Sequence, residues 1–262
     1  MDVAGQKWED GHPARIGHTP AVVPCFIVEP LDGYRSSRPL SLPPPVPSRP
    51  RIALFGGSFD PVHRGHLEVA RRASDHFALD QVIFMPAATP PHKVGKELAP
   101  GSARLAMLEC ATAEDPTWEV SDVELRRAGT SFTVDTLRSL SQDRCTGEGG
   151  AELFMIIGSD NLPGLPGWRE VEEVLTLAQP IIAWREGTPD GHLADLAGRL
   201  PESLIERLRE GFMELPPLPE SATEIRARIA TGTLEGTELP ATVLEVIERE
   251  GLYGIGSTEA RT

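Results

Sequence analysis

The amino-acid sequence predicts an α/β protein, in which a doubly wound parallel sheet is covered by helices on both faces and followed by a helical C-terminal portion. Short, nearly continuous apolar runs recur along the chain, as is typical of strands that are buried on both faces. Stretches with apolar residues at helical spacing separate these runs, and such alternation favours a parallel sheet. Apolar residues make up 40% of the 262 residues, which is enough to form the core of such a fold.

The predicted strands are short, and all of them except 118–125 are runs of mostly apolar residues. The strands cover residues 51–55, 81–85, 118–125, 152–157 and 180–184. Because ligands in sheets of this kind bind at the carboxyl ends of the strands, residues that directly follow a strand are candidates for the functional site. Gly56, the stretch 86–93 and Gly158 each stand in such a position.

The predicted helices separate the strands and then make up the C-terminal part of the chain. They lie near residues 65–77, 102–113, 133–141, 168–177, 192–210 and 221–230, with a last helix from Pro240. In the first of them Leu67, Ala70, Ala73 and Phe77 recur at the spacing of one helical face. Proline suits the first position of a helix, and Gly251 is expected to end the last one.

Residues 1–50 differ in composition from the rest of the chain. They hold 10 of its 25 prolines and show no hydrophobic periodicity. A segment of this kind cannot bury enough surface to offset its loss of conformational entropy, so we expect it to be extended or disordered. A docking arm for the domain or for a partner is the alternative. The sequence therefore predicts one domain over residues 51–256 and a tail at 257–262, with Val46 as a conceivable true start of the protein.

Charge and cysteine usage argue against several classes of protein. The formal charge of −14 and the pI near 5.0 disfavour a general nucleic-acid binder, which would carry a basic face. No apolar run approaches the roughly 18 residues of a membrane span, and the N-terminal sequence does not read as a secretory signal. Cys25, Cys110 and Cys145 show neither pairing nor metal-ligand spacing, and they indicate reduced thiols in the cytoplasm.

The most informative stretch is residues 56–67, Gly-Gly-Ser-Phe-Asp-Pro-Val-His-Arg-Gly-His-Leu, which links the first strand to the first helix. Its two leading glycines would let the backbone turn sharply and approach a ligand. The helix that begins near Gly65 offers unpaired N–H groups and a positive dipole end, both of which favour a phosphate. His63 and His66 stand at that helix start, so both imidazole rings can face one point. The stretch therefore predicts a polyphosphate site, whereas a metal-binding His-x-x-His pair is the plainer alternative.

In these residues the chain resembles the nucleotidyltransferases related to class I aminoacyl-tRNA synthetases, whose hallmark is the His-x-Gly-His turn, here His63-Arg64-Gly65-His66. Further stretches narrow the resemblance to the bacterial nicotinate mononucleotide adenylyltransferases. They are Pro90-Pro91-His92-Lys93, residues 131–137 (Ser-Phe-Thr-Val-Asp-Thr-Leu), Gly158-Ser159-Asp160 with Trp168 downstream, and residues 221–226 (Ser-Ala-Thr-Glu-Ile-Arg). The resemblance runs from about Arg51 to Gly256 and implies a Rossmann-like sheet of the nucleotidyltransferase type.

Several positions depart from the family pattern. Ser58 stands where the family usually has Thr, Phe132 where it has Tyr, and Ala222 where a second Ser or Thr is often found. The first change keeps a hydroxyl, but the other two each lose one. The loss at Ala222 removes one potential phosphate donor, although Ser221 and Thr223 remain beside it.

The resemblance implies adenylyl transfer from ATP to nicotinate mononucleotide, with Mg²⁺ accompanying the ATP and no metal site made by the protein itself. His63, His66 and Arg226 are the expected catalytic residues, because their N–H donors suit the phosphates. Ser221 is expected to cap the helix that carries Arg226, and Asp60 to have a structural role. The ATP-binding residues implied by the family are Gly56, Gly57, Ser58, Phe59, His63, Gly65, His66, Gly158, Asp160, Ser221, Thr223, Ile225 and Arg226.

The resemblance also implies a mononucleotide site. Its residues are Lys93, Ser131, Phe132, Thr133 and Trp168. In the family, the stretch around Thr133 holds the pyridine carboxylate, and a tryptophan ring stacks on the pyridine. Because the whole chain is acidic, the phosphates need a local positive island, to which Arg51 and Lys93 could add. The implied partners are the two small-molecule substrates, without nucleic acid or membrane, and a homo-oligomer is left open.

Other functions stay open at this point. An adenylyltransferase for phosphopantetheine shares the His-x-Gly-His turn, but such chains are typically shorter and lack the stretches around Lys93 and Thr133. A nicotinamide-preferring enzyme is closer, because backbone donors decide between a carboxylate and an amide. A catalytically silent nucleotide-binding regulator is disfavoured by the presence of both histidines and Arg226. A dehydrogenase is disfavoured because no Gly-x-Gly-x-x-Gly follows the first strand.

Overall fold

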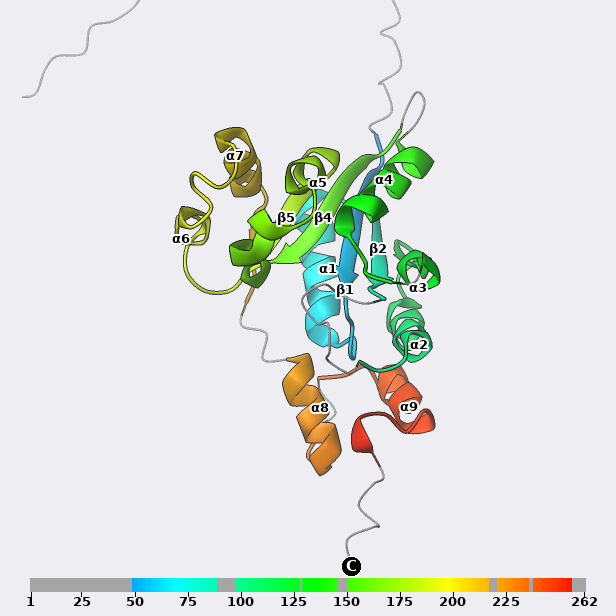
Figure 1. Cartoon of the computed structure of the whole chain (residues 1–262). Coiled ribbons are helices and arrows are strands. Elements are labelled where there is room, and N and C mark those ends of the chain that lie inside the picture. The colour runs from blue at the N-terminus through cyan, green and yellow to red at the C-terminus, as the bar shows by residue number, and fades with distance from the viewer. Residues whose placement is uncertain are drawn as a thin grey trace, which may run out of the picture. The chain divides into compact units, whose positions relative to one another are not determined.

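The computed structural model describes residues 49–88, 98–127, 129–145, 150–216, 221–235 and 238–255. The centre of this part is a parallel sheet of six strands in the order β3-β2-β1-β4-β5-β6 (Figure 1). The order reverses between β1 and β4, and the helices that follow these two strands pack on opposite faces. The predicted doubly wound sheet is confirmed, and its switch point lies at the carboxyl ends of β1 and β4.

Strand β1 is central to the sheet. The strands are β1 (Arg51–Gly57), β2 (Gln81–Pro86), β3 (Trp118–Val120), β4 (Glu152–Gly158), β5 (Gln179–Trp184) and β6 (Phe212–Glu214). β1 pairs with β2, where Gly57 lies opposite Pro86, and with β4, where Leu54 lies opposite Met155. The interior residues of β2 and β4 are all buried, which explains why these strands read as continuous apolar runs rather than alternating ones.

Helices surround this sheet and form the C-terminal part of the domain. They are α1 (Arg64–Phe77), α2 (Gly101–Thr112), α3 (Val123–Arg127), α4 (Thr133–Arg144), α5 (Val171–Leu177), α6 (Pro189–Ala194), α7 (Glu202–Glu210), α8 (Ala222–Thr231) and α9 (Ala241–Arg249). In the described part of the chain, the 3₁₀ helices η2 (Ser159–Gly167) and η3 (Leu252–Gly254) follow β4 and α9. Helix α9 packs against α2, and Gly251 follows it with a φ of 61°, as predicted for the end of this helix (Figure 1).

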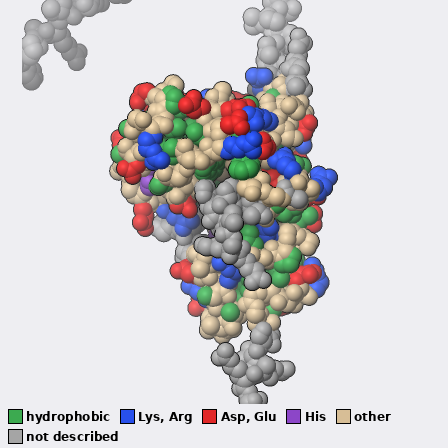
Figure 2. Space-filling view, viewed as in Figure 1, with side chains coloured by type: hydrophobic (Ala, Val, Ile, Leu, Met, Phe, Trp, Pro, Cys, Tyr) green, Lys and Arg blue, Asp and Glu red, His purple; other side chains and the backbone are tan. Residues whose placement is uncertain are grey.

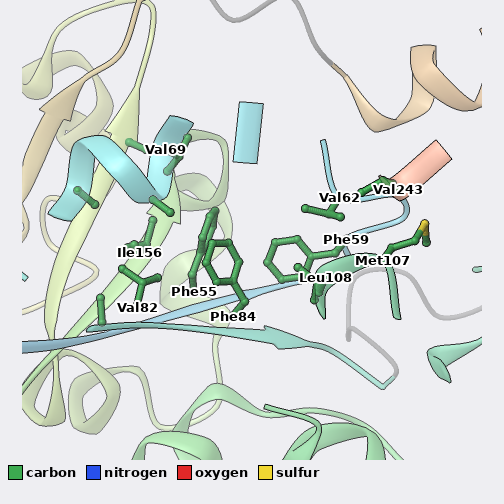
Figure 3. Packing of buried hydrophobic residues seen from close by; sticks show 14 of the residues in the cluster. Phe55, Phe59, Val62, Val69, Val82, Phe84, Met107, Leu108, Ile156 and Val243 are labelled. Atoms are coloured by element: carbon green, nitrogen blue, oxygen red, sulfur yellow. The ribbon is translucent and has the colours of Figure 1, made fainter. Parts of the chain in front are cut away.

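The core consists of two clusters, one on each face of the sheet. On one face the strand side chains pack against α1, α2, α8 and α9, and on the other against α4, α5, α7 and η2. In the first cluster the ring of Phe55 lies 5.5 Å from that of Phe59 and 5.5 Å from that of Phe84 (Figure 3). Because Phe59 belongs to the loop after β1, this loop is anchored in the close-packed core.

The two edge strands of the sheet, β3 and β6, have only three residues each. The predicted strand 118–125 ends at Val120, and the second half of that stretch forms helix α3 instead. Asp122 precedes α3, and its Oδ1 lies 2.9 Å from Nη2 of Arg126, one helical turn later. An ion pair at this spacing is typical of a helix. Strand β6, which was not predicted, pairs with β5 over only three residues. An element this short carries too little periodicity to be found from sequence.

The prediction of one continuous helix over residues 192–210 is wrong. It consists of α6 and α7, separated by residues 195–201. Gly198 adopts a φ of 75°, and Pro201 is the N-cap of α7. Both residue types interrupt a helix, so the break was visible in the sequence as a glycine and a proline.

The chain joins the domain from Arg49 onward. The Arg49 Nε–H donates to the Gly150 carbonyl oxygen at 2.8 Å, and the Pro50 carbonyl oxygen accepts from the Glu152 N–H at 2.7 Å. The predicted extension up to residue 48, which includes Cys25, and the predicted tail at 257–262 lie outside the described residues.

The described surface carries both signs of charge. In the face seen in Figure 2, acidic and basic side chains are interspersed rather than gathered by sign. Cys110 is exposed, Cys145 is half-buried, and both are free thiols. Within the described residues, no helix is long and apolar enough to cross a membrane.

Candidate active site

A cavity of about 1070 Å³ opens at the carboxyl ends of β1, β4 and β5. Its wall includes the ends of these strands, the first turns of α1, α4 and α8, and the 3₁₀ helix η2. These elements are distant in sequence, so the folding of the chain assembles the site. The position is the one that the strand-end rule predicts.

The loop between β1 and α1 turns at a phenylalanine rather than at a glycine. Gly56 and Gly57 lie inside β1 without a positive φ, whereas Phe59 has a φ of 45°. A Cβ on Gly57 would lie 3.2 Å from the Phe59 ring, so the glycine leaves room for that ring. A Cβ on Gly56 would meet no atom within 4 Å, so this side of the backbone is open to a ligand. The expectation that the two glycines make the turn is wrong, and their contribution is space.

His63 and His66 meet at the start of α1. Their ring centroids are 3.8 Å apart. His63 is the N-cap: its N–H donates to Nδ1 of His66 at 3.3 Å, and its carbonyl oxygen accepts from the His66 N–H at 2.9 Å. The His66 ring stands edge-on to Phe59, with 5.1 Å between the ring centroids. Both rings are therefore fixed by local contacts where they line the cavity.

His63 is the more buried histidine, with 6% of its surface exposed. Burial lowers the pKa of His63 from 6.5 to about 4, and the positive charge of Arg185 adds to the effect. At neutral pH the imidazole is therefore uncharged, with one N–H to donate and one nitrogen to accept.

Arg226 reaches the same cavity from the first turns of α8. Its Nη1 donates to the carbonyl oxygen of Asp60 at 2.6 Å, and its Nη2 donates to Oγ1 of Thr223 at 3.4 Å. Ser221 is the N-cap of α8 by position, as predicted, but its side chain makes no capping hydrogen bond. Its hydroxyl is thus not used to cap this described helix, and Ser221, Thr223 and Arg226 line the cavity together.

A buried arginine that no motif identified, Arg104, ties the loops of this wall together. It is 2% exposed. Its Nη1 donates to the carbonyl oxygens of Ser58 at 2.8 Å and of Ala87 at 2.9 Å, and its Nε donates to that of Ala99 at 3.0 Å. Burial lowers the pKa of Arg104, and the negative charge of Asp60 opposes this shift. The guanidinium thereby joins the chain after β1, the chain after β2 and the segment before α2.

Ser131, Thr133 and Trp168 form a different part of the cavity wall. Thr133 is the first residue of α4, where the backbone N–H groups have no partners within the helix. Oγ of Ser131 accepts from the Ala88 N–H at 3.1 Å, which leaves its own hydroxyl proton for another acceptor. This part of the wall therefore offers several donors near a helix N-terminus, an arrangement that suits an anion.

Trp168 lies outside any helix. The predicted helix 168–177 begins only at Val171, because the preceding stretch forms η2 with Pro163 and Pro166 inside it. The Trp168 side chain is half-buried and packs against the second core cluster. The Trp168 ring is therefore supported by the core and also lines the cavity.

The end of β4 contributes a carboxylate. A Cβ on Gly158 would lie 2.3 Å from Oδ1 of Asp160, so a side chain at this position would require the carboxylate to move. Asp160 is exposed, and the Asn161 Nδ2 donates to its Oδ1 at 3.3 Å. The carboxylate can accept further hydrogen bonds, for example from hydroxyl groups.

Most of the predicted site residues lie together in this cavity. They are Gly56, Gly57, Ser58, Phe59, His63, Gly65, His66, Ser131, Thr133, Gly158, Asp160, Trp168, Ser221, Thr223 and Arg226. The side chains of Phe132 and Ile225 do not line it: Ile225 is 1% exposed in the first core cluster, and Phe132 packs against the second, with Arg169 over its ring. Lys93 lies outside the described residues. Arg51 begins β1 at the opposite end of the sheet, so the expectation that it adds charge near the phosphates is wrong.

Several lining residues were missed by sequence reasoning. Arg185 and Glu186 directly follow β5, so the rule that selected the two strand-end glycines would also have found them. His192 lies beside them, with its Nε2 at 2.6 Å from the Glu186 carbonyl oxygen. Glu124 is a buried carboxylate in the wall, and no sequence signal distinguishes it from other acidic residues. Asp60, for which the sequence predicts a structural role, is also buried in this wall. In the described part of the chain, no group of three or more His, Cys, Asp or Glu side chains could hold a metal ion.

Comparison with known proteins gives a consistent result. Residues 54–228 match the cytidylyltransferase-like family model. Over 204 residues the chain is 39% identical to a protein of Roseiflexus sp. (strain RS-1) named "Probable nicotinate-nucleotide adenylyltransferase", covering 77% of this chain and 97% of that protein. A protein of the same name from Desulfitobacterium hafniense (strain DSM 10664 / DCB-2) is 39% identical over 206 residues, covering 78% and 96%. The structure of Plasmodium falciparum nicotinic acid mononucleotide adenylyltransferase complexed with NaAD has a similar fold, with a TM-score of 0.59 at 16% identity over 79% of this chain and 99% of that one.

Proposed function

The chain belongs to the nicotinate-nucleotide adenylyltransferases, which are cytidylyltransferase-like enzymes, and we propose how its cavity performs their reaction. The enzyme transfers the adenylyl group of ATP to nicotinate mononucleotide, a step of NAD biosynthesis that yields nicotinic acid adenine dinucleotide and pyrophosphate. One observation carries the proposal. A single cavity is lined both by His63, His66 and Arg226 and by Ser131, Thr133 and Trp168. We call the first group the phosphate end and the second the pyridine end, after the substrate parts that we assign to them.

The reaction needs no covalent intermediate on the protein. An oxygen of the mononucleotide phosphate attacks the α-phosphorus of ATP, in line with the bond to the bridging oxygen of the β-phosphate. The new P–O bond forms as the old one breaks, and pyrophosphate leaves with the electron pair. Catalysis then consists of holding the two substrates in line and stabilising the negative charge that develops.

We assign the phosphate end to this stabilisation. His63 and His66 contact the transferred phosphoryl group, and Arg226 contacts the β- and γ-phosphates as a multidentate donor. His63 is uncharged in the free enzyme, so it first acts as an N–H donor, and the phosphates then favour its protonation. The first turn of α8 adds backbone N–H donors, and the hydroxyl groups of Ser221 and Thr223 stand beside them.

The remaining ATP contacts are assigned to the strand ends. The open backbone at Gly56 and Gly57, with Ser58 and Phe59, is proposed to lie along the nucleotide, and Gly65 brings the start of α1 close to it. Asp160 is proposed to accept from ribose hydroxyl groups, with Gly158 leaving room for its carboxylate. Because the Ile225 side chain is in the core, only its backbone can contribute.

The pyridine end is assigned to the mononucleotide. The Trp168 ring stacks on the electron-poor pyridine, a favourable pair for a cationic ring. Thr133 and the N–H groups of the first turn of α4 hold the carboxylate, and the Ser131 hydroxyl supports them. Because N–H donors satisfy an anion but not the NH₂ of an amide, the site is expected to prefer nicotinate over nicotinamide mononucleotide.

A divalent cation accompanies ATP in reactions of this kind, and we propose Mg²⁺. The described residues form no carboxylate or histidine cluster that would bind it before the nucleotide does. The cation is therefore treated as part of the substrate, carried by the ATP phosphates. A cytoplasmic location, in keeping with the free thiols Cys110 and Cys145, is likewise proposed, with no nucleic acid or membrane as a partner.

Pyrophosphate release tests this function. Purified enzyme is supplied with ATP and Mg²⁺ together with nicotinate mononucleotide, nicotinamide mononucleotide or phosphopantetheine in separate reactions. We expect turnover with nicotinate mononucleotide, weaker turnover with the nicotinamide form and none with phosphopantetheine. Turnover of phosphopantetheine without release from either pyridine mononucleotide would overturn the proposal.

A further inference from the structure

The carboxylate of Asp60 joins segments that are far apart in the chain. Asp60 lies in the loop between β1 and α1 and is 2% exposed. Its Oδ1 accepts hydrogen bonds from the Tyr253 hydroxyl at 2.7 Å and from the Ala99 N–H at 3.2 Å. Tyr253 belongs to η3, and Ala99 precedes α2. A single buried carboxylate therefore connects the loop of the two histidines to the C-terminal turn and to the segment before α2.

The same aspartate determines where Arg226 stands. Its second carboxylate oxygen, Oδ2, lies 3.7 Å from Nη1 of Arg226, and its carbonyl oxygen accepts from this Nη1 at 2.6 Å. Arg226 also donates from Nη2 to the Thr223 hydroxyl, and 33% of its side chain is exposed. Asp60 thus fixes one edge of the guanidinium and leaves the rest open to the cavity.

Tyr253 is held firmly enough to serve as an anchor for Asp60. It adopts a left-handed conformation, with φ 57° and ψ 23°, which a residue other than glycine keeps only where its surroundings fix it. Its ring packs against the first core cluster, and η3 packs against both α8 and α9. Burial and the neighbouring Asp60 raise the pKa of Tyr253 well above its usual range. The hydroxyl therefore keeps its proton and stays a donor to the carboxylate.

We propose that Tyr253 is a positioning residue for adenylyl transfer: its hydroxyl orients the Asp60 carboxylate, which in turn holds Arg226 at the phosphate end of the cavity. Tyr253 does not line the cavity, so its effect on the reaction passes through Asp60. Without the hydroxyl, the Ala99 N–H is the one donor to Oδ1 that remains among the described residues, and the carboxylate regains a strong partner by turning toward the guanidinium of Arg226. A guanidinium drawn into a closer ion pair with Asp60 is withdrawn from the ATP phosphates. The inference rests on the proposed function, because it needs Arg226 to contact ATP.

The test begins with Tyr253→Phe, which keeps the ring in the core and removes only the hydroxyl. Thr242→Val is the matched control, because it removes an exposed hydroxyl from the adjacent α9, which donates to the Cys110 carbonyl oxygen at 3.4 Å. We expect Tyr253→Phe to lower kcat/KM for ATP about tenfold or more, since small misplacements near the reacting groups are costly. KM for nicotinate mononucleotide should stay within about twofold, and the control should leave both parameters unchanged. No change in Tyr253→Phe, or an equal loss in the control, would refute the proposal.

A double-mutant cycle with Arg226 separates positioning from general stability. If Tyr253 acts through Arg226, Tyr253→Phe should have little further effect on ATP affinity or turnover in an Arg226→Ala background. The same fold loss in both backgrounds would show that Tyr253 acts independently of Arg226 and would overturn the proposal. Where turnover of a variant is too slow to measure, its ATP affinity is measured by calorimetry instead. If Tyr253→Phe unfolds at the assay temperature, Asp60→Asn tests the same link. It should weaken ATP affinity or turnover in the wild-type background and have little further effect in the Arg226→Ala background.

The outcomes distinguish this inference from the proposed function. If wild-type enzyme releases no pyrophosphate with nicotinate mononucleotide, the proposed function fails. If it does so and Arg226→Ala retains full activity, the role of Arg226 fails, and the positioning proposal fails with it. If Arg226→Ala is impaired and Tyr253→Phe is not, the positioning proposal alone is wrong.

Discussion

The two ends of the cavity are built differently. The phosphate end is supported by two buried residues of its loop, Phe59 and Asp60, which are 1% and 2% exposed. Asp60 is hydrogen-bonded to Arg226 and Tyr253, which lie 166 and 193 positions further along the chain. At the pyridine end the side chains of Ser131, Thr133 and Trp168 are only half-buried. The segment that carries Lys93 lies outside the described residues.

This difference matches what each end has to do. Charge develops on the phosphates during the reaction, so donors there must be preorganised, and long-range contacts with the core supply that rigidity. The pyridine ring does not change during the reaction, so its site needs to recognise the ring rather than to respond to new charge. Changes at the phosphate end should therefore lower kcat, whereas changes at the pyridine end should raise KM for the mononucleotide.

The largest effect is expected for His66→Ala. The ring is fixed between His63 and Phe59, and we propose that it donates to charge that appears in the transition state. Loss of one such donor typically costs about 10²–10³-fold in kcat, with little change in either KM. His76→Ala is the matched control, since His76 is an exposed residue in the last turn of the same helix. A kcat for His66→Ala within about threefold of the wild type would show that this role is wrong.

The burial of the phosphate end also predicts a dependence of stability on pH. The pKa of His63 is about 4 in the folded domain and 6.5 in the unfolded chain, so between these values only the unfolded chain binds the proton. Stability from this group is thus lost as the pH falls from about 6.5 to 4, with no further loss below that. Between pH 7 and pH 5, the wild type should lose about 2 kcal/mol more unfolding free energy than His63→Gln. Urea denaturation of both proteins at the two pH values measures this, and equal losses would place the ring in a more solvated site.

A smaller effect is expected for Trp168→Ala at the pyridine end. A lost stack is worth about 0.5–2 kcal/mol beyond buried area, so KM for the mononucleotide should rise several-fold while KM for ATP is spared. Separate titrations of the two substrates measure both values. An equal loss for ATP would mean that the packing of Trp168 against the second core cluster is its main role.

The smallest effect is expected for removal of residues 1–46. We propose that the domain begins close to residue 51, and the described contacts before β1 start at Arg49. The truncated protein should keep its kcat, both KM values and its melting temperature. A fall in melting temperature of many degrees would show instead that the proline-rich segment packs on the domain.

The sequence predicts the fold better than the contacts within the site. Long apolar runs such as β4 identify the parallel sheet, because burial on both faces leaves an unmistakable pattern. Short elements such as β6 and α3 were missed or misread, because three to five residues carry too little periodicity. The prediction of one helix over residues 192–210 is wrong because Gly198 and Pro201 interrupt it.

At the site, the residues that could be predicted are those that belong to a local sequence motif. The His-x-Gly-His turn and the stretch ending in Arg226 could be found because their spacing is local. Arg104 and Tyr253 could not, because their importance comes from hydrogen bonds to backbone and carboxylate groups far away in the chain. The support of the phosphate end is therefore a tertiary property, and only the groups that it supports are visible in the sequence.

The division of labour between the two ends is tested most directly by one ratio, that of kcat/KM for nicotinate mononucleotide to kcat/KM for nicotinamide mononucleotide. It is measured for the wild type, His66→Ala and Thr133→Val. The account predicts a strong preference for nicotinate in the wild type and the same ratio in the much slower His66→Ala. In Thr133→Val it predicts a reduced ratio with kcat nearly intact. Equal use of both mononucleotides by the wild type, or a loss of the preference in His66→Ala, would contradict it.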